Sequence, residues 1–329
     1  MIVGFDIGGT NLRAAAFEAG AGDDGERPVA LAEHREPIGE ARDPVTVAAR
    51  IADIASRLVR DAGGTRLPRS PIPLGVGIAA ILRDRRGTVA NSPHLRWHDV
   101  RFGPLLAARL GPAFALGVYN DANAIAWGEH LCGAAYGVAD ALVVYAGTGI
   151  GGGVIANGRL VEGSTAAAGE IGHVKVRWDE GAALCACGSR GCFEAYAGGS
   201  YVARRIASEL GAGAKSAAIA LAGGVAHVTP SHVDAAAAAG DDWALSLWTE
   251  LAPLCAVALG NAIAILNPAR LVLGGGLFSR TPMLLDLIGA ALAVAVPPHA
   301  SESLDVAIAE LGDDAGLLGA ARLAADLAA

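Results

Sequence analysis

The apolar positions of this chain fall into short continuous runs, which are typical of buried strands, and longer runs with a helical period. Residues 2–20 contain a strand-like run, a glycine-rich turn and a second strand-like run. Residues 141–160 repeat this order. Two copies of one strand–turn–strand plan predict a duplicated protein with two lobes and a cleft between them.

Helical periods lie between and after these two units, and further apolar runs indicate strands. Strands are expected at residues 73–80, 114–119 and 270–276. Interleaved strands and helices place the chain in the α/β class. The helices are expected at residues 45–60, 104–110, 122–131, 201–210, 233–239 and 243–266, with a last helix after Gly312.

Two long apolar stretches raise the question of membrane spans. Residues 251–266 include Pro253 and Asn261, and residues 283–296 include Asp286. Both stretches fall short of the roughly 20 clean apolar residues that a span requires, so buried helices are expected. The N-terminus begins with a strand-like MIVGF, without a charged n-region or cleavage site, which indicates a cytoplasmic protein.

Charge narrows the classes of partner. The 329-residue chain has a formal net charge of -8, which argues against nucleic acid or a membrane surface as its main partner. It contains only two lysines, Lys175 and Lys215, and neither follows a glycine loop. Because there is no P-loop lysine, any phosphate must be held by backbone amides, hydroxyl groups and magnesium.

Three glycine-rich loops follow strand-like runs. Glycines let backbone N–H groups approach a phosphate, a threonine hydroxyl adds a donor, and a carboxylate at a strand end can hold magnesium through water. The third loop offers a flat surface for a base or ribose. A tight hairpin explains two glycines equally well, but three such loops favour phosphate binding. The predicted nucleotide-binding residues are Asp6, Gly8, Gly9, Thr10, Gly147, Thr148, Gly149, Gly274, Gly275 and Gly276.

Asn120 and Asp121 stand where an apolar run gives way to a helical period. A carboxylate at such a junction can accept a proton from a hydroxyl group while Asn120 orients that hydroxyl. Asp and Asn are also preferred residues at helix N-caps. The spacing alone leaves both interpretations open.

Three of the five cysteines, Cys185, Cys187 and Cys192, lie close together, and His173 precedes them. In a reducing compartment, clustered cysteines are more often metal ligands than disulfides. Three thiolates and one imidazole complete a tetrahedral zinc site and leave no open position, which predicts a structural metal. The other two cysteines lie singly in helical patterns and are expected to be small buried hydrophobes.

Together these motifs resemble the ROK family of sugar kinases and related repressors, and within it the bacterial glucokinases. The E-x-G-H element with the cysteine turn is the most specific part of the resemblance. The matching stretches run nearly end to end: DIGGT at 6–10, NDANAIAWGE at 120–129, GTGIGGGVI at 147–155, GSTAAAGEIGH at 163–173, CACGSRGCFE at 185–194 and NPARLVLGGG at 267–276.

The resemblance implies an actin-like, ribonuclease H-like duplicated two-lobe fold that closes over sugar and ATP. We expect an N-terminal lobe over residues 1–120, joined by the C-terminal helix at about 313–329. A C-terminal lobe over residues 121–312 would carry the zinc-binding loop. The family contains repressors with an additional N-terminal helix-turn-helix domain; the first strand is expected to begin here at Ile2, so no such domain is expected.

By the same resemblance, Asp121 is the general base. His173 is implied to ligate zinc together with the three clustered cysteines, using its two nitrogens for different partners. The metal would then fix the loop that presents His173 and Glu194 to the sugar. The implied sugar-binding residues are Asn120, Asp121, Glu170, His173 and Glu194.

The implied reaction is transfer of the γ-phosphoryl group of Mg-ATP to a hexose, with the 6-hydroxyl of glucose as the first candidate. Kinases for N-acetylmannosamine, fructose, mannose or allose, a polyphosphate donor, and a non-catalytic sugar sensor remain open. A homodimer or homotetramer is implied. The chain departs from the family pattern around the sugar pocket, at Ala79-Ala80, Leu82-Arg83, His94 and Tyr119.

Overall fold

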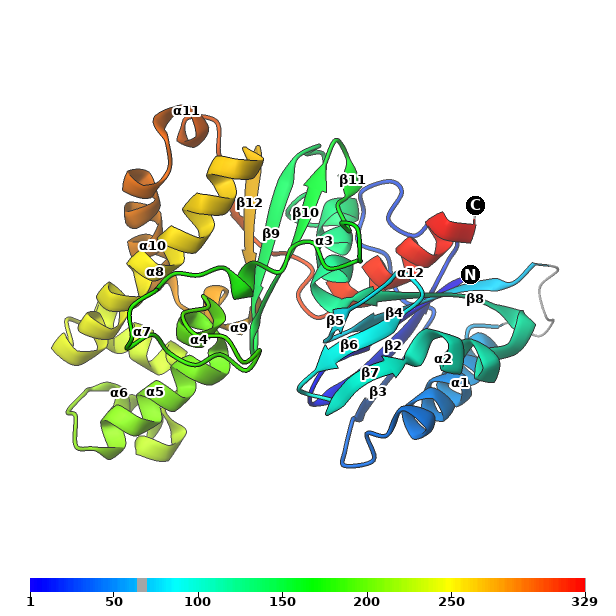
Figure 1. The fold of residues 1–329 in the computed structure, drawn as a ribbon, viewed down its shortest axis with the longest axis horizontal. Helices are drawn as coiled ribbons and strands as arrows, with labels where there is room; N and C mark the ends of the chain where they lie inside the picture. Colours follow the sequence, from blue (N-terminus) through cyan, green and yellow to red (C-terminus); the bar gives the residue numbers. More distant parts are fainter. Residues whose placement is uncertain (64–69, 329) are drawn as a thin grey trace. The chain divides into compact units, whose positions relative to one another are not determined.

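The computed structural model describes residues 1–63 and 70–328 (Figure 1). The chain forms two compact units: unit 1 comprises Met1–Ala139, Gly153–Gly169 and Glu310–Ala329, and unit 2 comprises Asp140–Gly152 and Glu170–Ala309. The C-terminal helix α12 (Asp314–Ala328) therefore belongs with the N-terminal unit. Helix α3 (Asp121–Cys132) also lies in unit 1, beyond the boundary expected at residue 120, because it packs along α12.

Unit 1 is built on a five-stranded sheet in the order β3-β2-β1-β4-β8. The pairs β1–β2 and β2–β3 are antiparallel, whereas β4 is parallel to both β1 and β8. The first two strands form the hairpin that carries the first glycine loop. The strands are β1 (Ile2–Ile7), β2 (Asn11–Phe17), β3 (Ala32–Pro37), β4 (Ile72–Ile78) and β8 (Phe114–Asn120).

The second sheet repeats this strand order as β11-β10-β9-β12-β13. Strand β12 is parallel to both β9 and β13, and β10 is antiparallel to β11. The second glycine loop joins the first two strands in chain order, as in unit 1. The predicted duplication is therefore present in the topology. The strands are β9 (Ala141–Ala146), β10 (Ile150–Ala156), β11 (Arg159–Leu160), β12 (Arg270–Gly274) and β13 (Asp305–Ile308).

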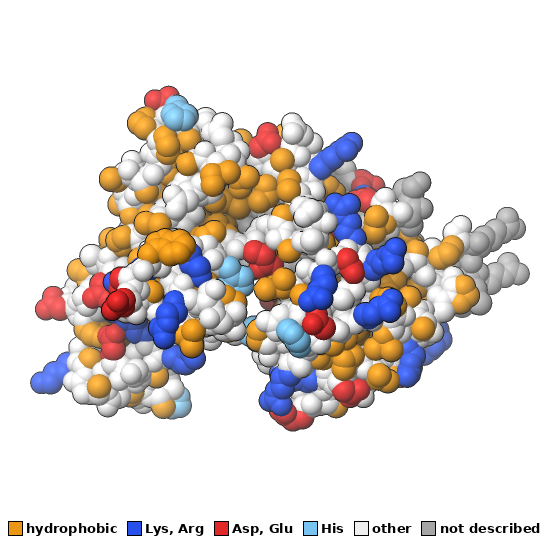
Figure 2. Space-filling view, viewed as in Figure 1, with side chains coloured by type: hydrophobic (Ala, Val, Ile, Leu, Met, Phe, Trp, Pro, Cys, Tyr) orange, Lys and Arg blue, Asp and Glu red, His pale blue; other side chains and the backbone are white. Residues whose placement is uncertain are grey.

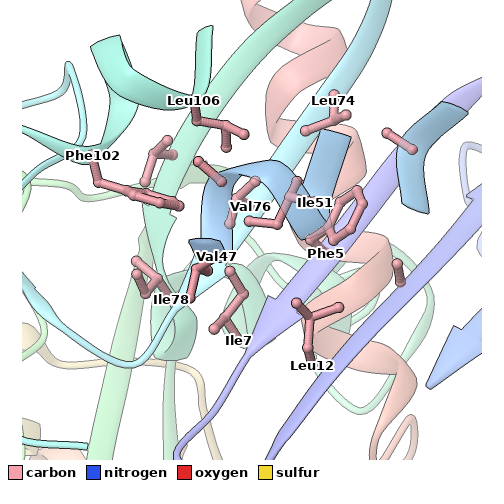
Figure 3. Close-up of a cluster of buried hydrophobic side chains, with 14 of the residues drawn as sticks. Phe5, Ile7, Leu12, Val47, Ile51, Leu74, Val76, Ile78, Phe102 and Leu106 are labelled. Carbon is pink, nitrogen blue, oxygen red and sulfur yellow. The ribbon is translucent and has the colours of Figure 1, made fainter. Parts of the chain in front are cut away.

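The core of unit 1 fills the space between its sheet and two helices (Figure 3). Helix α1 (Pro44–Asp61) is capped at its N-terminus by Asp43, whose side chain accepts a hydrogen bond from the Thr46 N–H at 2.9 Å. Helix α2 (Phe102–Leu110) packs beside α1. Because side chains alternate along a strand, one face of the sheet meets these helices. The side chains in contact include Phe5, Ile7, Leu12, Val47, Ile51, Leu74, Val76, Ile78, Phe102 and Leu106.

The opposite face of this sheet meets α12 through glycines. Gly4 and Gly75 lie next to each other in the register of β1 and β4. A Cβ atom at Gly4 would overlap the carbonyl oxygen of Leu317, and one at Gly75 would overlap that of Ala320. The missing side chains let the helix backbone lie directly on the sheet. A similar close approach joins α12 to α3, where a Cβ at Gly319 would overlap the Ala124 carbonyl oxygen.

A small antiparallel sheet of β5 (Ile81–Leu82), β6 (Thr88–Ser92) and β7 (Trp97–Arg101) follows β4. The space-filling view shows basic side chains gathered over this part of unit 1, and all of them are arginines, because both lysines of the chain belong to unit 2 (Figure 2). Two of its arginines have acidic partners: Arg83 pairs with Asp99, and Arg85 Nε lies 3.3 Å from Glu162 Oε2. These pairs offset part of the positive charge.

Unit 2 is mainly helical outside its sheet. Helix α8 packs against α7 and α10 and buries Trp248 and Leu259 completely. Among the described residues, α8 is the one helix long and apolar enough to cross a membrane, a test that a core helix also passes. Both apolar stretches in question are helices, as predicted. The helices are α4 (Glu194–Ala197), α5 (Gly199–Gly211), α6 (Ala218–Ala222), α7 (Pro230–Ala238), α8 (Asp242–Leu266), α9 (Gly275–Phe278), α10 (Pro282–Ala295) and α11 (Pro298–Ser301).

Two predicted strands are too long. The strand expected at 73–80 ends at Ile78, and the one expected at 270–276 ends at Gly274. Gly275 has φ +83°, a conformation that leaves the strand, and it opens the short helix α9. Three 3₁₀ turns complete the described elements, at Gly111–Ala113, Ile171–His173 and Val225–His227.

Candidate functional site

Asn120 closes strand β8 and caps helix α3. Its Oδ1 accepts a hydrogen bond from the Asn123 N–H at 3.1 Å, and its Nδ2 donates to the Ala80 carbonyl oxygen at 3.1 Å. The capping interpretation is therefore correct for Asn120. These two bonds also fix the start of the helix, so that Asp121 occupies its first turn.

Asp121 has the electrostatic character of a base that works near neutral pH. Burial of its carboxyl group, reinforced by the charge of Asp6, raises its pKa from 3.8 to about 6. The Ala122 N–H donates to Asp121 Oδ1 at 2.9 Å and opposes the shift. A base with a pKa near the working pH combines the right protonation state with useful basicity.

Asp6 lies at the end of β1 and forms an ion pair with Arg13 of β2. Burial nevertheless raises the pKa of Asp6, because the loss of hydration outweighs the attraction of Arg13. Arg13 also donates from Nη1 to the Asp313 carbonyl oxygen at 2.9 Å. The carboxylate predicted to face magnesium thus already has one cationic partner in unit 1.

The loop after β1 turns tightly, with the Gly8 N–H donating to the Asn11 carbonyl oxygen at 3.1 Å. A Cβ atom at Gly9 would lie 3.1 Å from the His94 ring, so His94 packs against this loop. One residue that departs from the family pattern therefore contacts the predicted phosphate loop. Thr10 is exposed, and its carbonyl oxygen accepts a hydrogen bond from the Ile38 N–H at 2.8 Å.

In unit 2, the structure brings the four predicted metal ligands together. The ligand atoms of His173, Cys185, Cys187 and Cys192 all lie within 4.8 Å of one another. Cys187 Sγ is 3.7 Å from Cys192 Sγ, and Cys185 Sγ is 3.8 Å from His173 Nδ1. Tetrahedral zinc with Zn–S bonds of about 2.3 Å separates its sulfurs by about 3.8 Å, so this donor set fits zinc.

The cysteine turn forms for local reasons. The Cys185 N–H donates to the Ser189 carbonyl oxygen at 2.8 Å, and the Gly188 N–H donates to the Cys185 carbonyl oxygen at 3.0 Å. Gly188 has φ +88°, which favours glycine. These bonds fold the segment back so that Cys192 lies beside Cys187. The remaining cysteines, Cys132 and Cys255, are buried in helices as predicted.

His173 and Glu194 connect this cluster to other polar groups. His173 directs Nδ1 to Cys185 and Nε2 to Glu170, whose Oε2 lies 3.8 Å away. Glu194 Oε1 lies 3.6 Å from Cys185 Sγ, and its Oε2 accepts a hydrogen bond from the Ile150 N–H at 2.9 Å. The two nitrogens of His173 thus face different partners, and Glu194 ties the cysteine turn to the start of β10.

The second and third glycine loops share one hollow of about 440 Å³ in unit 2. The loop backbone also holds the start of α5, because the Ser200 N–H donates to the Thr148 carbonyl oxygen at 2.9 Å. The hollow is lined by Gly147, Thr148, Gly199, Ser200, Thr229, Pro230, Ser231, Gly276, Leu277 and Arg280.

Three of the predicted glycines lie close to other parts of unit 2. A Cβ at Gly149 would overlap Glu194, one at Gly274 would overlap Tyr145, and one at Gly275 would crowd the Ala146 backbone. Conversely, sequence reasoning missed the polar lining of the hollow. The available signals were the Thr229-Pro230-Ser231 helix start and the cation Arg280 just after the third loop.

The fold and these clusters define a two-domain α/β protein of the actin-like kinase fold. The chain belongs to the ROK family, whose model matches residues 2–327. Glucokinase of Streptomyces coelicolor is 32% identical over 98% of this chain and 97% of that protein. A ROK family glucokinase of Streptomyces griseus in complex with glucose and AMPPNP has a TM-score of 0.76 and 31% identity, over 99% of each chain. ROK hexokinase of Thermus thermophilus has a TM-score of 0.78 and 30% identity, over 99% of this chain and 98% of that one.

Proposed function

We propose that this protein is an ATP-dependent hexose kinase that transfers the γ-phosphoryl group to the 6-hydroxyl of glucose. The observation that carries the proposal is Asp121, a carboxyl group with a pKa of about 6 at the first turn of α3. The chain of this protein is similar over nearly all of its length to a ROK family glucokinase whose structure was solved in complex with glucose and AMPPNP.

In this mechanism Asp121 accepts the proton of the sugar hydroxyl as that oxygen attacks the γ-phosphorus of ATP, the bond from this phosphorus to the bridging oxygen breaks, and ADP leaves. Asn120 is fixed by its own hydrogen bonds to the Asn123 N–H and the Ala80 carbonyl oxygen, so it can orient the hydroxyl without rearranging. Phosphoryl transfer depends mostly on positioning and charge stabilisation. A magnesium ion, when bound, neutralises charge on the phosphates, and Asp6 is the carboxylate proposed to hold it through water.

The donor nucleotide is proposed to bind unit 2 at the hollow between the second and third glycine loops. Its lining supplies the hydroxyl groups of Thr148, Ser200, Thr229 and Ser231, and the guanidinium group of Arg280. Gly8, Gly9 and Thr10 are proposed to contact phosphates from unit 1. This arrangement needs no lysine, which agrees with the absence of a P-loop in the sequence.

The sugar is proposed to bind Asn120, Asp121, Glu170, His173 and Glu194. His173 and Glu194 both contact the cysteine turn, so a zinc ion held by the Cys₃His set would fix their positions. With four protein ligands the site has no open position, and the proposed metal is structural. Cytoplasmic location, a homodimer or homotetramer, and the absence of nucleic-acid and membrane partners remain part of the proposal.

The test is sugar-dependent ADP release from Mg-ATP across glucose, mannose, fructose, allose, N-acetylglucosamine and N-acetylmannosamine. Glucose is expected to give the highest kcat/KM, with about one zinc per chain in the same sample. Preference for another sugar would leave the proposed chemistry unchanged. It would indicate that the departures from the family pattern at Ala80, Arg83 and His94 determine which sugar is preferred. Phosphorylation of the sugar with polyphosphate in place of ATP would identify polyphosphate as a phosphoryl donor. Sugar binding without turnover would favour a non-catalytic sensor.

A further inference from the structure

Lys175, one of only two lysines in the chain, lies opposite a predicted metal ligand. Lys175 and Cys192 pair in an antiparallel β-bridge. Two backbone hydrogen bonds flank this pair: the Phe193 N–H donates to the Val174 carbonyl oxygen at 2.9 Å, and the Val176 N–H donates to the Gly191 carbonyl oxygen at 2.9 Å. Lys175 Nζ donates to Cys192 Sγ at 3.0 Å. The backbone pairing therefore holds the ammonium group against one particular sulfur.

The negative charge around the cysteine cluster makes a cation favourable at this contact. Three thiolates around a divalent ion leave the centre with one net negative charge. Glu194 lies beside Cys185 and Glu170 lies beside His173, which adds further negative charge on those sides. Lys175 supplies positive charge on the Cys192 side. Arg190, which also belongs to the cysteine turn, donates instead to the Ala182 carbonyl oxygen at 3.0 Å.

We propose that Lys175 is a positioning residue for the metal centre, donating a charge-assisted hydrogen bond to the metal-bound thiolate of Cys192. The bond stabilises the anionic centre against loss of zinc and lowers the nucleophilicity of that sulfur. Outer partners of metal ligands commonly change metal affinity by roughly 10- to 100-fold. The inference rests on the zinc site that accompanies the proposed function, and it requires no catalytic role for Lys175.

The first test is zinc competition with the chromogenic chelator 4-(2-pyridylazo)resorcinol. Lys175→Met is expected to weaken zinc binding about 10-fold. Lys175→Arg should restore most of the affinity, because it keeps the charge and an N–H donor. Lys215→Met is the matched control, since Lys215 is exposed and should leave zinc affinity unchanged.

The second test is alkylation of Cys192 by iodoacetamide in the zinc-loaded proteins, followed by mass spectrometry. In this reaction the sulfur forms a bond to carbon as iodide leaves. Because Cys192 is buried, the absolute rate also depends on opening of the turn, so the comparison between variants is the readout. Lys175→Met is expected to react several-fold faster than wild type, and Lys175→Arg, which keeps the charge and an N–H donor, is expected to react at close to the wild-type rate. If Lys175→Met does not fold, Lys175→Gln takes its place.

Zinc affinity and alkylation rate that both stay within about twofold of wild type in the Lys175 variants would overturn the inference. A wild-type protein that binds no zinc would overturn the metal centre and the inference together. Failure of the kinase assignment alone would appear in the sugar assays and leave both zinc measurements as they are.

Discussion

The negative charge of Asp6 reinforces the effect of burial on Asp121, whose pKa is raised to about 6. A general base must be deprotonated, so kcat/KM for the sugar should fall as the pH drops below about 6. Asp6→Asn should move this acidic limb to lower pH, because burial still raises the pKa of Asp121 but the neighbouring charge is gone. A pH–rate profile of both proteins checks this. Glu33→Gln, which changes an exposed strand residue, should leave the limb in place.

Asp121→Asn should lower turnover by roughly 10²- to 10⁴-fold, the usual contribution of a general base, while sugar affinity stays within a few fold. Asp242→Asn is a matched control, because Asp242 occupies the corresponding first position of α8 and is exposed. Steady-state kinetics together with equilibrium sugar binding separate the two effects. Near wild-type turnover of Asp121→Asn would remove Asp121 from the mechanism.

The same substitution has a pH-dependent effect on stability. Folding raises the pKa of Asp121 from 3.8 to about 6, so the folded protein binds this proton more tightly than the unfolded chain does. The resulting contribution to the free energy of unfolding is fully present below pH 3.8 and is lost as the pH rises through 6. Asp121→Asn should therefore raise the free energy of unfolding at pH 8 by up to about 3 kcal/mol, and by much less near pH 4. Urea unfolding at the two pH values measures this. An equal effect at both would show that ionisation of Asp121 is not its cause.

Cys187→Ala should release zinc and weaken sugar binding more than ATP binding. Its sulfur lies 3.7 Å from that of Cys192, so its loss leaves an incomplete ligand set near His173 and Glu194. Metal content and separate calorimetric titrations with sugar and nucleotide measure the outcome. Cys255→Ala is the control, because Cys255 is buried in α8 and should not affect the metal. Unchanged sugar affinity in zinc-free Cys187→Ala would contradict the supporting role.

The sequence predicts most helices and both glycine hairpins because their apolar periods are long or their turns carry glycine. Strand β3 escapes prediction, since its residues Ala32–Pro37 alternate between half-buried and exposed without a hydrophobic face. The membership of α3 in unit 1 depends on close packing such as that of Gly319 on Ala124, which no local pattern reveals.

The candidate site also has one part that the sequence predicts and another part that it does not. The cysteine turn is predictable because its ligands are close in sequence and chemically distinctive. The hollow is not, since Thr229 and Arg280 line it from separate segments of the chain. The closeness of Gly149 to Glu194 likewise depends on the fold and not on a local pattern. From the sequence, Lys175 is only a lysine that does not follow a glycine loop. The role proposed for it depends on the β-bridge that places it opposite Cys192.

Arg280 provides a test of the donor site. If its guanidinium group contacts the nucleotide from the wall of the hollow, Arg280→Gln should remove a charge-assisted hydrogen bond of about 1.5–3 kcal/mol. This corresponds to a rise of roughly 10- to 100-fold in the KM for ATP, with little change in the KM for sugar. Arg270→Gln is the control, because Arg270 pairs with Asp305 at 2.8 Å and does not line the hollow. Equal effects of the two variants on the KM for ATP would place the nucleotide elsewhere. An effect confined to Arg280→Gln would support the hollow as the site where unit 2 holds the phosphoryl donor.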